Sequence, residues 1–105
     1  MFERLGDAGL RVSGAGDRHV SRVAVVPGSG ADFLSAARSL GADAIVTGDV
    51  SHHRIVAAND RGLSVIDPGH TPTERPGMAA LVAAVARATD ATIVDLTDAD
   101  PTPWR

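Results

Sequence analysis

The sequence predicts an α/β fold, with a mostly parallel sheet of about five strands, helices on both faces and the order β-β-α-β-α-β-α-β. Two observations predict it. Short β-branched runs alternate with alanine-rich stretches of helical periodicity, and glycine or proline separates them. Continuous apolar strands that alternate with helices are typical of parallel sheets with right-handed crossovers. The 105 residues, 44% of them apolar, are enough for a single domain over 1–105.

The elements follow from these patterns in chain order. A hairpin through the turn at 14–17 would join the first two strands and add an antiparallel edge. Expected strands are residues 10–13, 20–26, 43–47, 63–66 and 91–96.

Three helices are expected between these strands. The first spans 31–40, where Phe33, Leu34, Ala37 and Leu40 share a face and Gly41 is the stop signal. The second begins after Asp49 or Ser51 as cap and ends at Gly62, and the third spans 78–88. An acidic, proline-containing tail closes the chain.

Composition excludes several functional classes. The net charge is -3 and no basic run exists, which disfavours nucleic-acid binding. Cysteine is absent, so a metal site must use histidine, carboxylates or water. No signal peptide and no apolar run of membrane-spanning length is present, so we expect a cytoplasmic protein with no membrane partner.

The strongest site candidates are His70 and Glu74, which follow the strand at 63–66. In open α/β sheets, binding sites lie beyond the carboxyl ends of the strands. An imidazole and a carboxylate at this point could bind Zn, Mn, Fe or Co. The alternative is a helix-capping box over Thr71–Glu74. Pro76 disfavours Thr71 as N-cap, because it would then fall inside the helix; Thr73 as N-cap places it in the first turn.

Two other motifs sit at the same predicted edge. His52 and His53 open a helix but point about 100° apart, so one metal cannot readily take both. We name His53 as the candidate general acid or base, against the alternative of two exposed first-turn residues. The glycines at 28 and 30 could hold an anion on free N–H groups, although a tight turn is the favoured interpretation.

Three segments in register resemble one known family. They are residues 23–30 (VAVVPGSG), 41–53 (GADAIVTGDVSHH) and 66–77 (IDPGHTPTERPG), and the ending with Pro103 and Trp104 is also similar. In order and spacing they resemble the C-terminal half of the NIF-three-like proteins, often labelled GTP cyclohydrolase 1 type 2 homologs.

The resemblance implies an α/β fold, a toroidal hexamer and a cleft with two divalent metal ions (Zn, Mn or Fe). It matches the metal ligands of the C-terminal half to His70 and Glu74. The family's His-His pair and aspartate from the N-terminal half have no counterpart here, and His52–His53 belongs to a different segment.

We therefore expect a metal-binding, hydrolase-like protein whose two-metal site is incomplete in this chain, with little metal affinity and no turnover when the chain is alone. Its small-molecule substrate is unknown. The alternative is a non-catalytic oligomeric scaffold or regulatory binding module.

Overall fold

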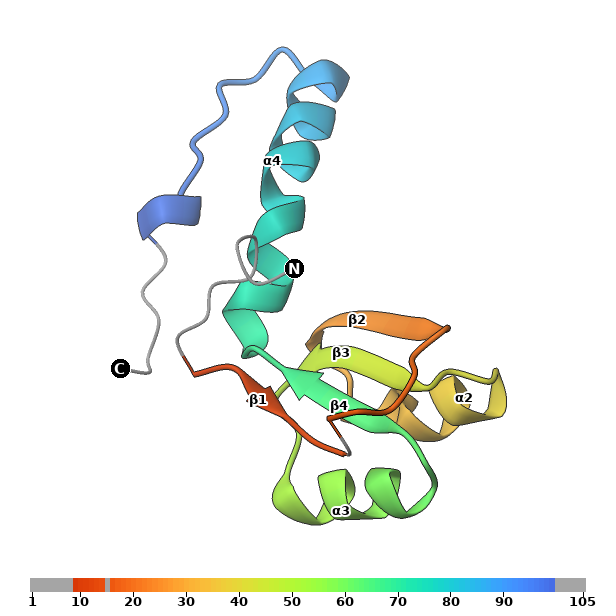
Figure 1. The fold of residues 1–105 in the computed structure, drawn as a ribbon. Helices are drawn as coiled ribbons and strands as arrows, with labels where there is room; N and C mark the ends of the chain where they lie inside the picture. The colour runs from red at the N-terminus through yellow and green to blue at the C-terminus, as the bar shows by residue number, and fades with distance from the viewer. Residues whose placement is uncertain (1–8, 15, 100–105) are drawn as a thin grey trace.

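The computed structural model describes residues 9–14 and 16–99, and shows a four-stranded mixed sheet with helices (Figure 1). The sheet order is β1-β4-β3-β2, with β2, β3 and β4 parallel and β1 antiparallel to β4. Three α-helices and two 3-10 helices complete the described part. The elements are β1 Arg11–Val12, β2 Val23–Ser29, η1 Ala31–Phe33, α2 Leu34–Ser39, β3 Ala44–Gly48, α3 His52–Asp60, β4 Ser64–Asp67, α4 His70–Ala88 and η2 Thr97–Ala99.

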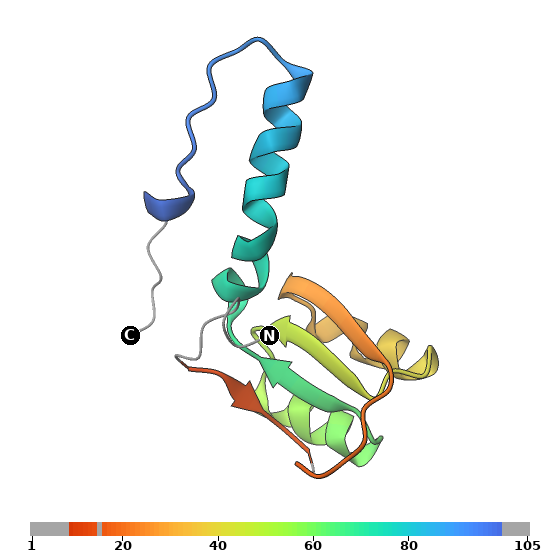
Figure 2. The same cartoon turned by 45° about the horizontal axis from the view of Figure 1, so that its top comes forward.

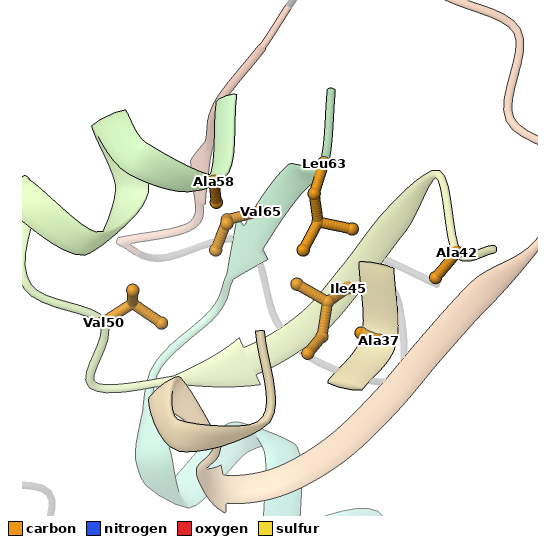
Figure 3. Close-up of a cluster of buried hydrophobic side chains, with 7 residues drawn as sticks. All are labelled: Ala37, Ala42, Ile45, Val50, Ala58, Leu63 and Val65. Atoms are coloured by element: carbon orange, nitrogen blue, oxygen red, sulfur yellow. The ribbon is translucent and has the colours of Figure 1, made fainter. Parts of the chain in front are cut away.

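The hydrophobic core lies on one face of the sheet, under α2 and α3. Ala24, Ile45 and Val65 are register partners across β2, β3 and β4, so their side chains share that face. Ala37 of α2 and Ala58 of α3 close over them (Figure 3). Because β2, β3 and β4 advance in one direction across the sheet, right-handed crossovers place both helices on the same face. The sequence predicted helices on both faces of the sheet, whereas these two helices cover one face.

The strand predictions were only partly right. The first strand does not form a hairpin with the second; it crosses to β4, where Arg11 pairs with Asp67. The second strand begins later and runs through Pro27 to Ser29, with an irregular register after Val25 that suits a proline in an edge strand.

The fifth strand, expected at 91–96, is absent from the described sheet. The 19 residues of α4 carry the chain away from the strands before this segment begins, and Val94 and Leu96 are exposed. Figures 1 and 2 show the outer turns of α4 extending beyond the sheet and the following segment turning back. Residue 15 of the predicted turn, and Asp100 to Trp104 of the tail, lie outside the described residues.

The first two helices form near their predicted positions. The first is a 3-10 turn followed by α2, and Gly41 ends it with a φ of 82°. Its predicted apolar face is correct for Ala37, but Phe33 and Leu40 are exposed. The second, α3, starts after Ser51, and Gly62 follows it with a φ of 80°.

The third helix begins eight residues before its predicted start. Gly69, with a φ of 106°, is the N-cap residue of α4, so both threonine caps considered from the sequence are wrong. Pro76 lies inside the helix, where it cannot donate to the carbonyl of Pro72. None of the helices in the described part combines the length and apolar character that a membrane crossing requires.

Gly48 lies where the C-terminal ends of β2, β3 and β4 meet. A Cβ on this residue would lie 2.5 Å from the carbonyl oxygen of Gly28, 2.6 Å from the carbonyl carbon of Gly69 and 2.6 Å from the amide nitrogen of His70. All three atoms belong to the backbone, so no side-chain rotation relieves the contact. Only glycine lets the ends of β2, β3 and β4 approach in this way.

We predict that Gly48→Ala lowers the free energy of unfolding by about 1–3 kcal/mol, because the loops must move apart. Gly77→Ala is the matched control. A Cβ there meets nothing within 4 Å, and alanine in a helix is favoured over glycine by about 0.5–1 kcal/mol. Urea unfolding of both variants measures the difference. Equal stabilities for the two would contradict the close approach.

Hydrogen bonds to Asp43 join the start of β2 to the start of β3. The carboxylate of Asp43 accepts hydrogen bonds from the Ser21 and Arg22 amides and from the Ser21 hydroxyl, each at 3.0 Å. The two amide hydrogen bonds, then the hydroxyl, lower the pKa of Asp43 below 3.8. The ionised form therefore stabilises the fold above pH 3.8, and this contribution is lost as the pH falls through the lower folded-state pKa.

We predict that Asp43→Ala lowers the Tm at neutral pH, and that its difference from the parent chain shrinks once the pH falls below 3.8. Thermal unfolding followed by circular dichroism at several pH values measures this. Asp90→Ala, at an exposed position, is the control and should leave the Tm unchanged throughout. A pH-independent Tm loss in Asp43→Ala would count against the carboxylate as the cause.

Candidate metal centre

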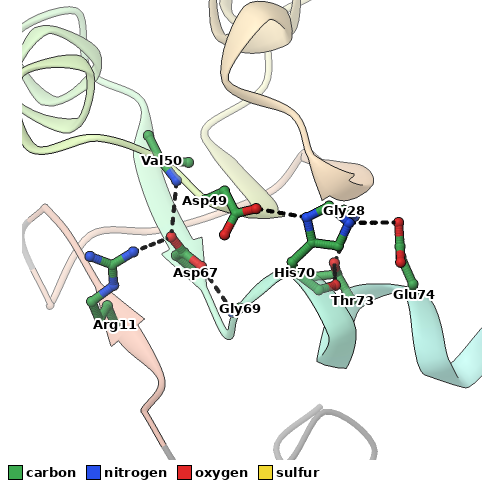
Figure 4. Close-up of polar contacts among 9 residues, drawn as sticks. All are labelled: Arg11, Gly28, Asp49, Val50, Asp67, Gly69, His70, Thr73 and Glu74. Carbon is green, nitrogen blue, oxygen red and sulfur yellow. Dashed lines mark hydrogen bonds and ion pairs between the residues drawn. The ribbon is translucent and has the colours of Figure 1, made fainter. Parts of the chain in front are cut away.

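His70 and Glu74 lie next to each other at the C-terminal edge of the sheet. His70 is the first residue of α4 and Glu74 lies one turn later. The His70 Nε2 and Glu74 Oε1 atoms are 3.1 Å apart (Figure 4). Both side chains are about half exposed, so the pair opens to solvent on one side.

Asp49 holds the other ring nitrogen of His70. Its Oδ2 lies 2.7 Å from Nδ1, at the exit of β3. Asp49 has a φ of 58°, an unusual conformation for a residue with a side chain. A histidine that binds metal through one nitrogen commonly donates the other N–H to a carboxylate, which fixes the tautomer. Neutral His70 in this arrangement donates from Nδ1 and keeps the Nε2 lone pair facing Glu74.

The two carboxylates also affect the titration of His70. The hydrogen bond to Asp49 is the main cause that raises the pKa of His70 above 6.5; burial of the ring opposes it, and the charges of Glu74 and Asp49 add to it. Without a metal, a proton can therefore occupy the space between Nε2 and Oε1. A metal ion would compete with that proton for the same position.

Gly28 keeps this position free of protein atoms. A Cβ on Gly28 would lie 2.6 Å from Glu74 Oε1 and 3.3 Å from His70 Nε2, beside both of these atoms. The Gly28 amide donates to the Thr73 hydroxyl at 2.7 Å, and that hydroxyl donates to the His70 carbonyl at 2.6 Å. The end of β2 is thereby tied to the first turn of α4.

Asp67, the last residue of β4, stabilises the same edge of the sheet. It is only 2% exposed and forms an ion pair with Arg11 of β1. It also accepts the amides of Gly69 at 2.9 Å and Val50 at 3.2 Å. Sequence reasoning missed both Asp67 and the role of Asp49 at His70. An aspartate that ends a buried apolar strand was the available signal for Asp67.

The donor set fits a divalent metal but does not complete a site. One imidazole nitrogen and one carboxylate oxygen suit Zn, Mn or Fe, and the space that a Gly28 side chain would fill lies beside both of these atoms. In the part of the chain described, no group of three or more His, Asp or Glu side chains is arranged to hold an ion.

His53 is not brought to this pair by any contact among the described residues. It lies exposed in the first turn of α3, next to His52, and no hydrogen bond or ion pair described joins it to His70 or Glu74. Its role as a proton carrier stays a prediction.

Comparison with known proteins relates this chain to a family. The model of the Duf34/NIF3 (NGG1p interacting factor 3) family matches residues 1–103. A GTP cyclohydrolase 1 type 2 homolog of Nostoc sp. is 51% identical over 63 residues, which are 60% of this chain and 24% of that protein. A homolog of the same description from Clostridium acetobutylicum is 44% identical over 69 residues, which are 66% of this chain and 26% of that protein.

Solved structures agree with this match. A Bacillus cereus protein related to NIF3 is 34% identical, with a TM-score of 0.77 over 85% of this chain and 24% of that one. A Thermus thermophilus protein, TTHA1606, is 34% identical, with a TM-score of 0.66 over 90% of this chain and 37% of that one. The chain spans about a quarter of the length of the curated relatives above. It belongs to the Duf34/NIF3 family.

Proposed function

We propose that this chain supplies the His70–Glu74 arm of a divalent-metal site in a hydrolase-like protein of the Duf34/NIF3 family. The observation that supports this most directly is the 3.1 Å approach of Nε2 to Oε1 while Asp49 occupies Nδ1. The remaining ligands of a two-metal site would come from parts of the protein beyond the quarter that this chain matches.

In this proposal each residue has a defined task. His70 and Glu74 would hold Zn, Mn or Fe, and Asp49 would orient the imidazole. The bound ions would lower the pKa of a water molecule and polarise the substrate. His53 would carry protons, an assignment that rests on the sequence argument alone.

The wider context of this function is also proposed. The substrate is a small molecule of unknown identity, the assembly is the hexamer implied by the sequence resemblance, and the location is cytoplasmic. No observation favours the alternative of a non-catalytic scaffold or binding module. Two protein ligands make a weak site, so the chain alone is expected to bind metal poorly and to turn over no substrate.

We predict that Zn²⁺ added to the chain shifts the ring proton resonances of His70 in a saturable manner, with weak affinity. His70→Ala should remove this binding, and Glu74→Gln should weaken it about tenfold or more, because a charged ligand is lost. His52→Ala, which removes an exposed imidazole of α3, is the matched control and should leave it unchanged. Zn²⁺ binding that survives in His70→Ala would overturn the proposed ligand.

We also predict that metal affinity falls as the pH drops through the pKa of His70, because the metal must displace the Nε2 proton. Asp49→Asn removes the main cause of the raised pKa, so His70 should titrate at a lower pH than in the parent chain. It should also cost about 10–100-fold in metal affinity through the lost orientation of the ring. Titration of the His70 ring resonances measures the first effect. An unchanged pKa in Asp49→Asn would contradict the role of that hydrogen bond.

A further inference from the structure

A groove of about 290 Å³ lies between α2 and α3, away from the metal centre. It exists because both crossover helices cover the same face of the sheet and flank a shared strip of core. Leu34, Ala58 and Leu63 form its apolar part, of which Figure 3 shows Ala58 and Leu63. Ala31 and Ala57 also line it, and their side chains are too short to fill the space between the helices.

Three arginines surround the apolar part of the groove. Arg38 reaches from α2 to the carbonyl of Arg61 at 2.7 Å, and Arg61 reaches back to the Ser35 hydroxyl at 3.5 Å. Arg54 of α3 pairs with Asp32 of η1 at 2.7 Å. These contacts cross between the helical segments at separate points, so the groove is preformed and its guanidinium groups are held at its rim.

The charge of this groove is opposite to that of the chain. Three arginines against one aspartate give its lining a formal charge of +2, whereas the whole chain carries -3. Each guanidinium has five N–H donors and uses one of them in the contacts above, which leaves donors for a ligand. Arginine binds phosphate and carboxylate oxygens with paired N–H groups.

We propose that this groove binds a small phosphate monoester with an apolar body. The phosphate dianion matches the +2 lining and the paired donors of Arg38 and Arg61. The apolar body would lie against Leu34, Ala58 and Leu63. The volume is at the lower end of small-molecule sites, which limits the body to about the size of one ring. This site is independent of His70 and Glu74.

Phenyl phosphate is the probe that tests this, in backbone amide NMR titrations of the whole chain at about pH 7.5, where the phosphate is a dianion. We expect saturable shifts confined to residues 31–38 and 54–63. Affinity should fall about tenfold in Arg38→Gln/Arg61→Gln, because charged hydrogen bonds are lost. It should also fall with added salt. Inorganic phosphate should bind at least about tenfold more weakly, because it buries no apolar surface.

Two matched pairs separate binding from folding defects. Arg87→Gln removes an arginine from the last turn of α4 and should bind as the parent does. Ala57→Leu places a larger side chain in the groove without changing its charge and should block the probe, whereas Ala84→Leu on exposed α4 should not. Unshifted amides in these two segments, or equal affinity in the parent, Arg38→Gln/Arg61→Gln and Ala57→Leu, would overturn the proposal.

Discussion

The arrangement of the strand ends next to His70 depends on the buried carboxylate of Asp67. It lies at the end of β4 and joins Arg11 of β1 to the amides that follow β3 and β4. A buried charge is costly unless it is paired and hydrogen-bonded, and here the partners are one guanidinium and two amides. Because these partners belong to different strands or to the residues that follow them, the carboxylate fixes the strand ends relative to one another. His70 comes directly after Gly69, so its position is fixed as well.

The first turn of α4 starts from this fixed position and places the side chains of His70 and Glu74 next to each other. Gly69 turns the chain into the helix at once, so that His70 and Glu74 fall at positions i and i+4 on one side. Thr73 lies between them. Its hydroxyl accepts a hydrogen bond from the Gly28 amide and donates one to the His70 carbonyl, and it does not cap the helix. The same hydroxyl thus connects the end of β2 with the residue that faces Glu74.

The sequence was a good guide where one local pattern decides the outcome. The parallel core strands and the stop at Gly41 both follow from local periodicity or composition. Contacts between residues that are distant in sequence could not be predicted in the same way. The partner of β1 depends on which edge is open, and Asp49 reaches His70 through the neighbouring strand exit, 21 positions away in sequence. The β-branched run at 91–96 has strand propensity, but α4 carries it away from the sheet.

The length of α4 raises the question of how its outer turns affect the His70–Glu74 pair. Leu81 and Val85 are 55% and 44% exposed, and α4 has no buried residue, so little tertiary packing supports those turns. The first turn is different, because Thr73 ties it to β2 and Asp49 ties His70 to the exit of β3. Pro76 separates the two parts, since its missing N–H interrupts the backbone ladder of the helix. The geometry of His70 and Glu74 is therefore set by the sheet edge, and movement of the outer turns need not reach it.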